Sequence, residues 1–408
     1  MNTRALPSAA PRNVTHWIAV LAATLCGIAV AANVGKVAIT LPQLREGFGL
    51  SLTQAGWVSS AINTLAVSLG LFIGFLGDRV GPLRLCLVGL ALAIAGGIGA
   101  LFADGFVALL ASRFVEGAGY MAVAVSGPAL LSAAATLRDR RFALGIWSCF
   151  IPAGIGLVMI AAPLLDALGG WAMVWVFTIA LLAVAMFGLL RFRAEYHVPA
   201  VAGDDGPALA MAREALARPQ PWILAIAFGC WALQHFTLIV WLPTFLSEQR
   251  GLPPMWVAAL SCLMVIVNVP GNLLGGALVQ RNLPRGGLIA GASVVTGLSA
   301  VGLFSDALPD LVRYALCLAV SFTGGLIPSS IISSSTVLAR TPRQIGTLQG
   351  LFMQGSNLGT FVGPPLIAFL VARRGEWGDA MWLPFGAACL CGVLGLLILR
   401  LERRAARG

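Results

Sequence analysis

The chain has 408 residues, of which 59% are hydrophobic and only 10% are charged, and its formal net charge is +10. A soluble core cannot bury so large a share of apolar residues, so we expect lipid to be the solvent of most of the chain. In a soluble protein the positive charge would suggest nucleic acid. Here the arginines follow the membrane topology described below, and we expect no nucleic-acid partner.

Apolar runs, each long enough to cross a hydrocarbon core of about 30 Å as a helix, follow one another along the chain. The runs are continuous rather than alternating, which favours a helical bundle over a β-barrel. The predicted fold class is therefore an all-α integral membrane protein with twelve transmembrane helices in two halves of six. The predicted spans are 17–42, 54–77, 83–103, 105–136, 143–165, 170–191, 221–246, 254–279, 284–304, 308–338, 345–372 and 379–400.

The arginines set the predicted orientation. If the N-terminus is inside, most arginines fall on the cytoplasmic side, and only Arg45, Arg250, Arg373 and Arg374 fall outside the membrane on the opposite side. The positive-inside rule then places both termini in the cytoplasm, and we expect a bacterial inner-membrane protein. The first run is too long for a secretory signal. All eight cysteines lie within spans, which indicates packing rather than a disulfide framework or a metal site.

The chain repeats itself on either side of a stretch that mixes Gly, Pro and charge, 194–220, which reads as a cytoplasmic linker. "RFVEGAGYMAVAVSGP" (113–128) corresponds to "RYALCLAVSFTGGLIP" (313–328), an offset near 200 that recurs along both halves. The predicted domains are an N-terminal half at 1–193 and a C-terminal half at 221–408. A duplicated six-helix unit with parallel repeats resembles the architecture of major facilitator carriers.

The stretch "GFLGDRVGPLR" at 74–84 resembles the signature of the major facilitator superfamily between its second and third helices. The residues that carry the resemblance are Gly74, Asp78, Arg79, Gly81 and Arg84. A glycine followed by Pro82 suits a tight turn, and a carboxylate here can meet the positive N-terminal end of a helix in the other half. The resemblance implies a gating role for these residues. The corresponding stretch at 275–285 has Val279 in place of the acidic residue.

Two further motifs extend the resemblance. "RFVEGAGY" (113–120) is similar to the helix-four pattern of the family, in which Gly117 and Gly119 permit close helix approach. "GIWSCFIPAGIG" (145–156) resembles the helix-five pattern of exchangers, but Ile151 replaces the expected glycine. The stretch "GKVAITLPQLREGFGLS" (35–51), the variant helix-five motif and the short loops are similar to the cyanate and nitroimidazole permease group. This similarity implies a small polar or anionic solute.

Lys36 is the only lysine of the chain and lies inside the first span. It is roughly 9 Å from the outer end of that span, so its side chain can snorkel toward the interface. Asn33 shares its helical face, and a charge within a span usually faces the bundle interior, because exposure to lipid costs at least ~2.5 kcal/mol. We expect Lys36 and Asn33 to bind an anionic or electron-rich substrate group; proton transfer by Lys36 is the alternative.

Arg113 and Glu116 stand three residues apart on one face of the fourth span. Mutual pairing with a structural role is one interpretation. The other is a proton-coupling pair, in which Glu116 takes up a proton and frees Arg113 for the substrate. Both interpretations stay open at this stage.

The remaining substrate-binding candidates are polar or aromatic side chains in other spans. Each has a structural alternative, which is helix packing, interhelical hydrogen bonding or exposure to lipid. The candidates are Tyr120, Trp147, Gln234, His235, Trp241, Asn268, Gln354 and Asn357.

The function that we predict is secondary active transport of a small organic anion or polar solute by alternating access, with protons as the coupling ion. Export of lipophilic drugs or metabolites is the alternative. The spans lack a nucleophile with its base, so we expect no enzymatic activity. No Gly-Lys-Ser/Thr nucleotide loop occurs, and we expect no cofactor. The expected partners are the lipid bilayer and a small-molecule substrate, and the expected state is a monomer.

Overall fold

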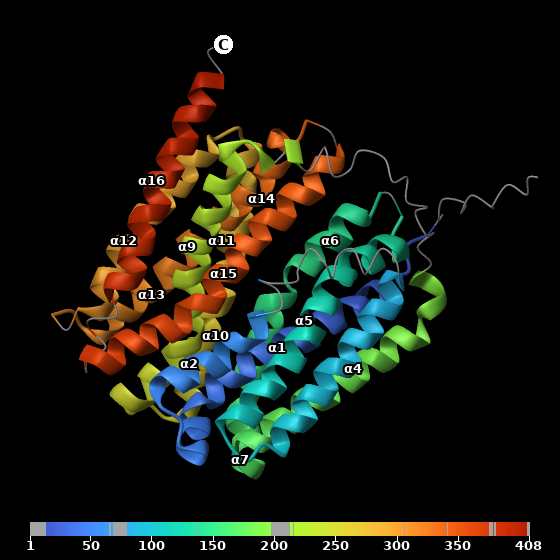
Figure 1. Cartoon of the computed structure of the whole chain (residues 1–408), viewed down its shortest axis with the longest axis vertical. Helices are drawn as coiled ribbons and strands as arrows, with labels where there is room; N and C mark the ends of the chain where they lie inside the picture. The colour runs from blue at the N-terminus through green and yellow to red at the C-terminus, as the bar shows by residue number, and fades with distance from the viewer. Residues whose placement is uncertain are drawn as a thin grey trace, which may run out of the picture.

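The computed structural model describes residues 14–64, 67, 80–136, 138–196, 213–214, 216–305, 307–340, 342–374, 378 and 381–405. Within these residues the chain is helical and contains no strand. Figure 1 shows two bundles of long helices side by side, one blue to green and the other yellow to red. Ten of the described helices are long and apolar enough to cross a membrane.

The N-terminal bundle is built from the helices before the linker. Its elements are α1 (Trp17–Phe48), α2 (Leu52–Ser60), η1 (Ala61–Asn63), α4 (Pro82–Leu101), α5 (Phe106–Ala134), α6 (Arg140–Ser148), α7 (Phe150–Arg191) and η2 (Arg193–Tyr196). α7 covers most of the predicted span 143–165 and all of the predicted span 170–191. The helical backbone is interrupted between them, at Gly169 and Gly170. The predicted span 54–77 begins as α2 and η1, and most of its second half lies outside the described residues.

The C-terminal bundle begins after the linker, most of which also lies outside the described residues. Its elements are α9 (Pro219–Thr244), η3 (Phe245–Gln249), α10 (Pro254–Ile266), α11 (Asn268–Gln280), α12 (Arg285–Phe304), α13 (Asp310–Gly324), α14 (Leu326–Leu338), α15 (Pro342–Arg374) and α16 (Trp382–Ala405). α4 and α12, which the predicted repeat pairs with each other, both have 20 residues.

Three spans that were predicted as continuous helices are each divided in two by a proline. The preceding helix ends at Ser148, Ile266 and Gly324, in each case four residues before a proline, at 152, 270 and 328. A proline ring clashes with the carbonyl of the residue four positions earlier and has no N–H to donate to it. The clash accounts for a break at these three positions, whereas Pro42, Pro128 and Pro243 lie inside helices that continue through them.

The two bundles touch at the end of the molecule where α1 ends and α2 begins, which we call the distal end. Arg45 Nη1 at the end of α1 lies 2.7 Å from Glu248 Oε1 in η3. The rings of Trp57 in α2 and Phe361 in α15 have centroids 5.5 Å apart. These contacts join α1 and α2 of one bundle to η3 and α15 of the other.

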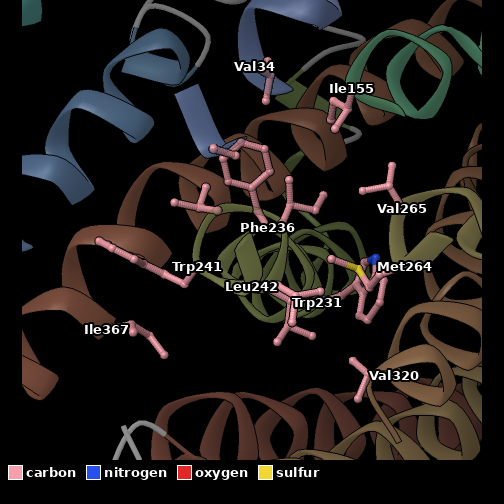
Figure 2. Packing of buried hydrophobic residues seen from close by; sticks show 14 of the residues in the cluster. Val34, Ile155, Trp231, Phe236, Trp241, Leu242, Met264, Val265, Val320 and Ile367 are labelled. Carbon is pink, nitrogen blue, oxygen red and sulfur yellow. The ribbon is translucent and has the colours of Figure 1, made fainter. Parts of the chain in front are cut away.

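A buried apolar cluster continues the contact toward the middle of the molecule. Figure 2 shows Val34 of α1 and Ile155 of α7 facing Phe236 of α9 and Val265 of α10. All four side chains are at least nine-tenths buried. In addition, Cys262 Sγ of α10 donates to the Gly156 carbonyl of α7 at 3.6 Å. The bundles therefore share a core at the distal end and the centre.

Close approach of α4 and α5 depends on glycine, and substitution tests it. A Cβ at Gly119 would lie 2.4 Å from the carbonyl oxygen of Gly89, so Gly119→Ala must push the helices apart. We expect the variant to lose about 1–3 kcal/mol of unfolding free energy in a denaturation assay in detergent. Gly276→Ala in α11 is the matched control, because a Cβ there meets nothing within 4 Å. Equal losses in both variants would contradict this explanation.

Candidate functional site

The ammonium group of Lys36 is enclosed inside the N-terminal bundle. Lys36 Nζ donates to Asn33 Oδ1 at 2.6 Å and to Glu116 Oε1 at 2.5 Å. It also lies 3.4 Å from Thr178 Oγ1 and 4.5 Å from the centroid of the Trp175 ring. The Lys36 side chain is 0% exposed, so it turns inward and does not snorkel to the end of the span.

Glu116 lies between two cationic side chains. While Glu116 Oε1 accepts from Lys36, its Oε2 accepts from Arg113 Nη1. The guanidinium also donates from Nη2 to the Asn33 carbonyl at 2.9 Å and from Nε to the Val58 carbonyl at 3.4 Å. Lys36, Arg113 and Glu116, which we call the charge triad, are all 0% exposed. In the ionised state the triad holds one more positive than negative charge.

The positions of small residues make room for the triad. A Cβ at Gly96 of α4 would lie 2.7 Å from Glu116 Cγ, so only glycine lets the carboxylate side chain pass there. A Cβ at Gly117 would lie 2.4 Å from the Ile62 carbonyl oxygen, which brings η1 against α5. The spacing of three residues places Lys36 beside Asn33 on α1 and Arg113 beside Glu116 on α5.

Two partners of the triad were absent from the sequence-based candidates. Thr178 and Trp175, both on α7, stand three residues apart and contact Lys36. The sequence contains one indication of these two partners, which is that a threonine and a tryptophan share a face of the predicted span at 170–191. Beside the triad, the Asn33 Nδ2 and Trp175 Nε1 donors are buried and have no hydrogen-bond acceptor in the described part of the chain.

A cavity of about 340 Å³ lies between the two bundles. It brings together four predicted binding residues, Tyr120 and Trp147 from the N-terminal bundle and Gln354 and Asn357 from the C-terminal bundle. Tyr120 follows Glu116 by one helical turn on α5, although the three residues of the charge triad do not themselves line the cavity. Gln354 Nε2 donates across the bundles to the Val67 carbonyl at 2.8 Å.

The aromatic wall of this cavity is held in place by glycines. A Cβ at Gly127 would lie 2.0 Å from the six-membered ring of Trp147, and one at Gly27 would lie 2.8 Å from it. The same indole lies 4.6 Å from the Phe150 ring, centroid to centroid. Trp147 is therefore fixed between α1, α5 and α7, with one side on the cavity.

His235 and Asn268 lie in a separate polar cluster inside the C-terminal bundle. His235 Nε2 lies 2.9 Å from Ser321 Oγ, and its ring stacks on Trp231 at 4.9 Å between centroids. Ser321 also donates to the Met264 carbonyl at 2.6 Å, and Asn268 Nδ2 donates to the Ser321 carbonyl at 2.7 Å. Neither residue lines the cavity between the bundles.

The side chains of Gln234 and Trp241 also have their hydrogen-bond partners inside the C-terminal bundle. Gln234 Nε2 donates to the Cys230 carbonyl at 3.2 Å, while its Oε1 is buried with no partner in the described residues. Trp241 Nε1 donates to the Pro364 carbonyl at 3.1 Å, and its ring lines a small pocket of about 30 Å³. Neither of these two predicted binding residues lines the cavity between the bundles.

The predicted gating residues are only partly described. Gly81 has a φ of 90° and precedes α4, and Arg84 is exposed in its first turn. Gly74, Asp78 and Arg79 lie outside the described residues. Over the described ranges, no group of three or more His, Cys, Asp or Glu side chains could hold a metal ion.

Two helical bundles that share a cavity beside a buried charge network are the architecture of a membrane carrier. The model of the Major Facilitator Superfamily matches residues 23–354, and the chain belongs to this family of transporters. It is an integral membrane protein and not an enzyme.

Several curated proteins and solved structures are similar over nearly the whole chain. A probable sulfoacetate transporter of Cupriavidus necator is 24% identical over 89% of this chain and 89% of its own length. The 3-(3-hydroxy-phenyl)propionate transporter of Escherichia coli is 26% identical over 91% and 90%. A bacterial homologue of the human lysosomal transporter Spinster, in an inward-facing and unoccupied conformation, superposes with a TM-score of 0.77 at 15% identity, covering 94% of this chain and 96% of its own. The predicted fold class is confirmed.

Proposed function

We propose that this transporter carries a small organic anion by alternating access, and that the anion binds beside the charge triad. The observation that carries the proposal is the unequal charge of the triad: Lys36 and Arg113 are fully buried with a single carboxylate, Glu116, between them. A surplus charge in a membrane interior is costly, and an anion in the neighbouring cavity offsets it. The similar transporters are named for sulfoacetate and a phenylpropionate, which are both organic anions.

The same geometry supports coupling to protons. When Glu116 takes up a proton, both cations of the triad lose their shared counter-charge, and the attraction for an anion increases. Thermodynamic linkage makes the effect reciprocal, so a bound anion favours protonation of Glu116 by the same factor. The anion and the proton then cross the membrane together as a neutral pair.

The positions of the contacts between the bundles support an assignment of which side of the membrane this conformation is closed to. The bundles are joined at the distal end, whereas the cavity lies on the other side of the charge triad along α5. With both termini in the cytoplasm of a bacterial cell, this arrangement is closed to the outside. Gly81 and Arg84, the described members of the predicted gating motif, are then at the cytoplasmic end, where we expect the motif to latch the opposite conformation.

A second candidate function is export of lipophilic compounds. The specific observation in its favour is the lining of the cavity, which consists mostly of apolar side chains such as Met121, Val125 and Met353. A lipophilic cation, however, would meet a surplus of positive charge at the triad. Binding of such cations is therefore an outcome that the experiment below separates from anion transport.

Uptake into proteoliposomes tests the proposed function. A pH gradient is imposed on the vesicles, with either the interior or the exterior more alkaline. Uptake of labelled sulfoacetate, 3-phenylpropionate and galacturonate is then measured in turn. We expect at least one anion to accumulate when the interior is alkaline, because proton entry then drives anion entry, and a protonophore to abolish the accumulation. Accumulation of a lipophilic cation in place of every anion would contradict the proposal and favour the second candidate.

A further inference from the structure

We infer that the transported anion has a flat apolar body, such as an aromatic ring, and a single carboxylate head group. The inference rests on the proposed function and goes further, since it names the chemistry of the part of the substrate that carries no charge. Its basis is the lining of the cavity between the bundles, which combines a few polar side chains with an apolar wall.

The polar part of the lining consists of four side chains, one of which, Gln354, already donates to the Val67 carbonyl. Tyr120 and Trp147 contribute a hydroxyl and an indole N–H, and Asn357 contributes an amide. Within the described residues, none of these three side-chain groups has a hydrogen-bond partner. Tyr120 is one helical turn from Glu116, so its hydroxyl lies on the side of the charge triad, whereas Trp147 packs against Gly127, eleven residues from Glu116 along α5. A donor beside a positive charge matches one carboxylate group.

The apolar wall occupies the rest of the cavity. Its residues are Met121, Ala124, Val125, Pro128, Phe150, Ile151 and Met353. A sugar acid would place several hydroxyl groups against these side chains, and each buried hydroxyl without a hydrogen-bond partner weakens binding. The wall therefore rejects polyhydroxylated anions and accepts an apolar body of the same size.

Two features give the wall its shape. Trp147 is fixed by Gly27 and Gly127 and stands 4.6 Å from the Phe150 ring, which presents a rigid aromatic surface. Rigid aromatic surfaces favour flat rings through offset or edge-on stacking. Across the gap, Met353 of α15 supplies a flexible thioether that adapts to a ring.

Ile151 is the residue at which this chain departs from the helix-five pattern, where a glycine is expected. Its side chain is 37% exposed and lines the cavity, so it adds apolar surface where a glycine would leave the backbone open. The geometry thus assigns a specificity role to the departure: Ile151 narrows the choice of substrates to those with an apolar body.

Competition between anions with different bodies tests the inference. Thermal stabilisation of the purified full-length chain is titrated with 3-phenylpropionate, galacturonate and sulfoacetate. We expect 3-phenylpropionate to act at a concentration at least about tenfold lower than galacturonate. Ile151→Asn, which leaves the charge triad intact, is expected to reduce that ratio by about tenfold, because the amide can pair with a hydroxyl.

The controls keep the outcomes separate. Trp147→Leu is expected to weaken binding of 3-phenylpropionate more than binding of sulfoacetate, whereas Trp382→Leu, an exposed tryptophan on α16, changes neither. Preference for galacturonate or sulfoacetate in the wild type overturns the inference and leaves anion transport standing. Stabilisation by lipophilic cations alone overturns both. If Trp147→Leu does not fold, Ile151→Asn decides the question, since its side chain is partly exposed.

Discussion

Glu116→Gln is expected to lower the unfolding free energy of the protein without added anion by about 3–5 kcal/mol. The amide keeps the size of the side chain but leaves Lys36 and Arg113 fully buried without their shared carboxylate. Because the variant has a stronger surplus of positive charge, the stabilisation by a bound anion should be larger than in the wild type. Thermal denaturation in detergent, with and without anion, measures both effects.

The same substitution is expected to separate exchange from accumulation. Glutamine cannot take up a proton, so a pH gradient should no longer drive net uptake, while exchange of internal for external anion continues. Glu248→Gln is the matched control, because Glu248 pairs with Arg45 at a partly exposed position. That change is expected to cost about 0–1 kcal/mol and to leave gradient-driven uptake intact. Equal effects of the two substitutions would contradict a special role for Glu116.

Lys36→Met is expected to affect stability and anion binding in the opposite way, with a small loss of stability and a large loss of anion affinity. The variant keeps the Arg113–Glu116 pair, whose charges balance, and methionine fills the space of the lysine stem, so the fold should lose far less stability than Glu116→Gln loses. Binding of the anion should weaken at least about thirtyfold, since its buried counter-charge is gone. Titration of the thermal shift with anion measures the loss. Unchanged anion affinity in Lys36→Met would remove Lys36 from the site.

A double variant shows whether the two residues act through charge. Lys36→Met combined with Glu116→Gln leaves Arg113 as the one cation of the triad, so the net charge returns to that of the wild type. We expect the double variant to be more stable than Glu116→Gln alone, which gives a favourable coupling energy in the double-mutant cycle. Additive losses would show that the residues act independently.

The sequence predicted the helices well because lipid imposes a simple rule, which is that a crossing segment must be long, apolar and internally hydrogen-bonded. The breaks before Pro152, Pro270 and Pro328 agree with a local rule, the clash of proline with the preceding turn. That rule does not separate these three prolines from Pro42, Pro128 and Pro243, which lie inside continuous helices. Contacts within one helix, such as Arg113 with Glu116, were accessible because they depend only on spacing along the helix.

The partner of Lys36 could not be predicted from the sequence. Lys36 and Glu116 are 80 positions apart, on different helices, and their contact depends on how α1 and α5 are rotated about their axes. Close glycine contacts limit these rotations: Gly96 of α4 meets Glu116 of α5, and Gly35 of α1 meets Ile155 of α7. For the same reason the sequence could not separate Tyr120 and Trp147, which line the shared cavity, from His235, which pairs with Ser321 inside one bundle.

A charge series on one molecular body tests the central claim most directly. Thermal stability is measured with 3-phenylpropionate, its neutral amide and 3-phenylpropylamine, and in parallel with sulfoacetate as a second anion. A ligand at ~100 times its dissociation constant stabilises the fold by about 2.7 kcal/mol, which such a measurement resolves. We predict that an anion stabilises the wild type, that the amide and the amine do not, and that the effect disappears in Lys36→Met. Equal stabilisation by the amine, or an undiminished effect in Lys36→Met, would contradict an anion site at the charge triad.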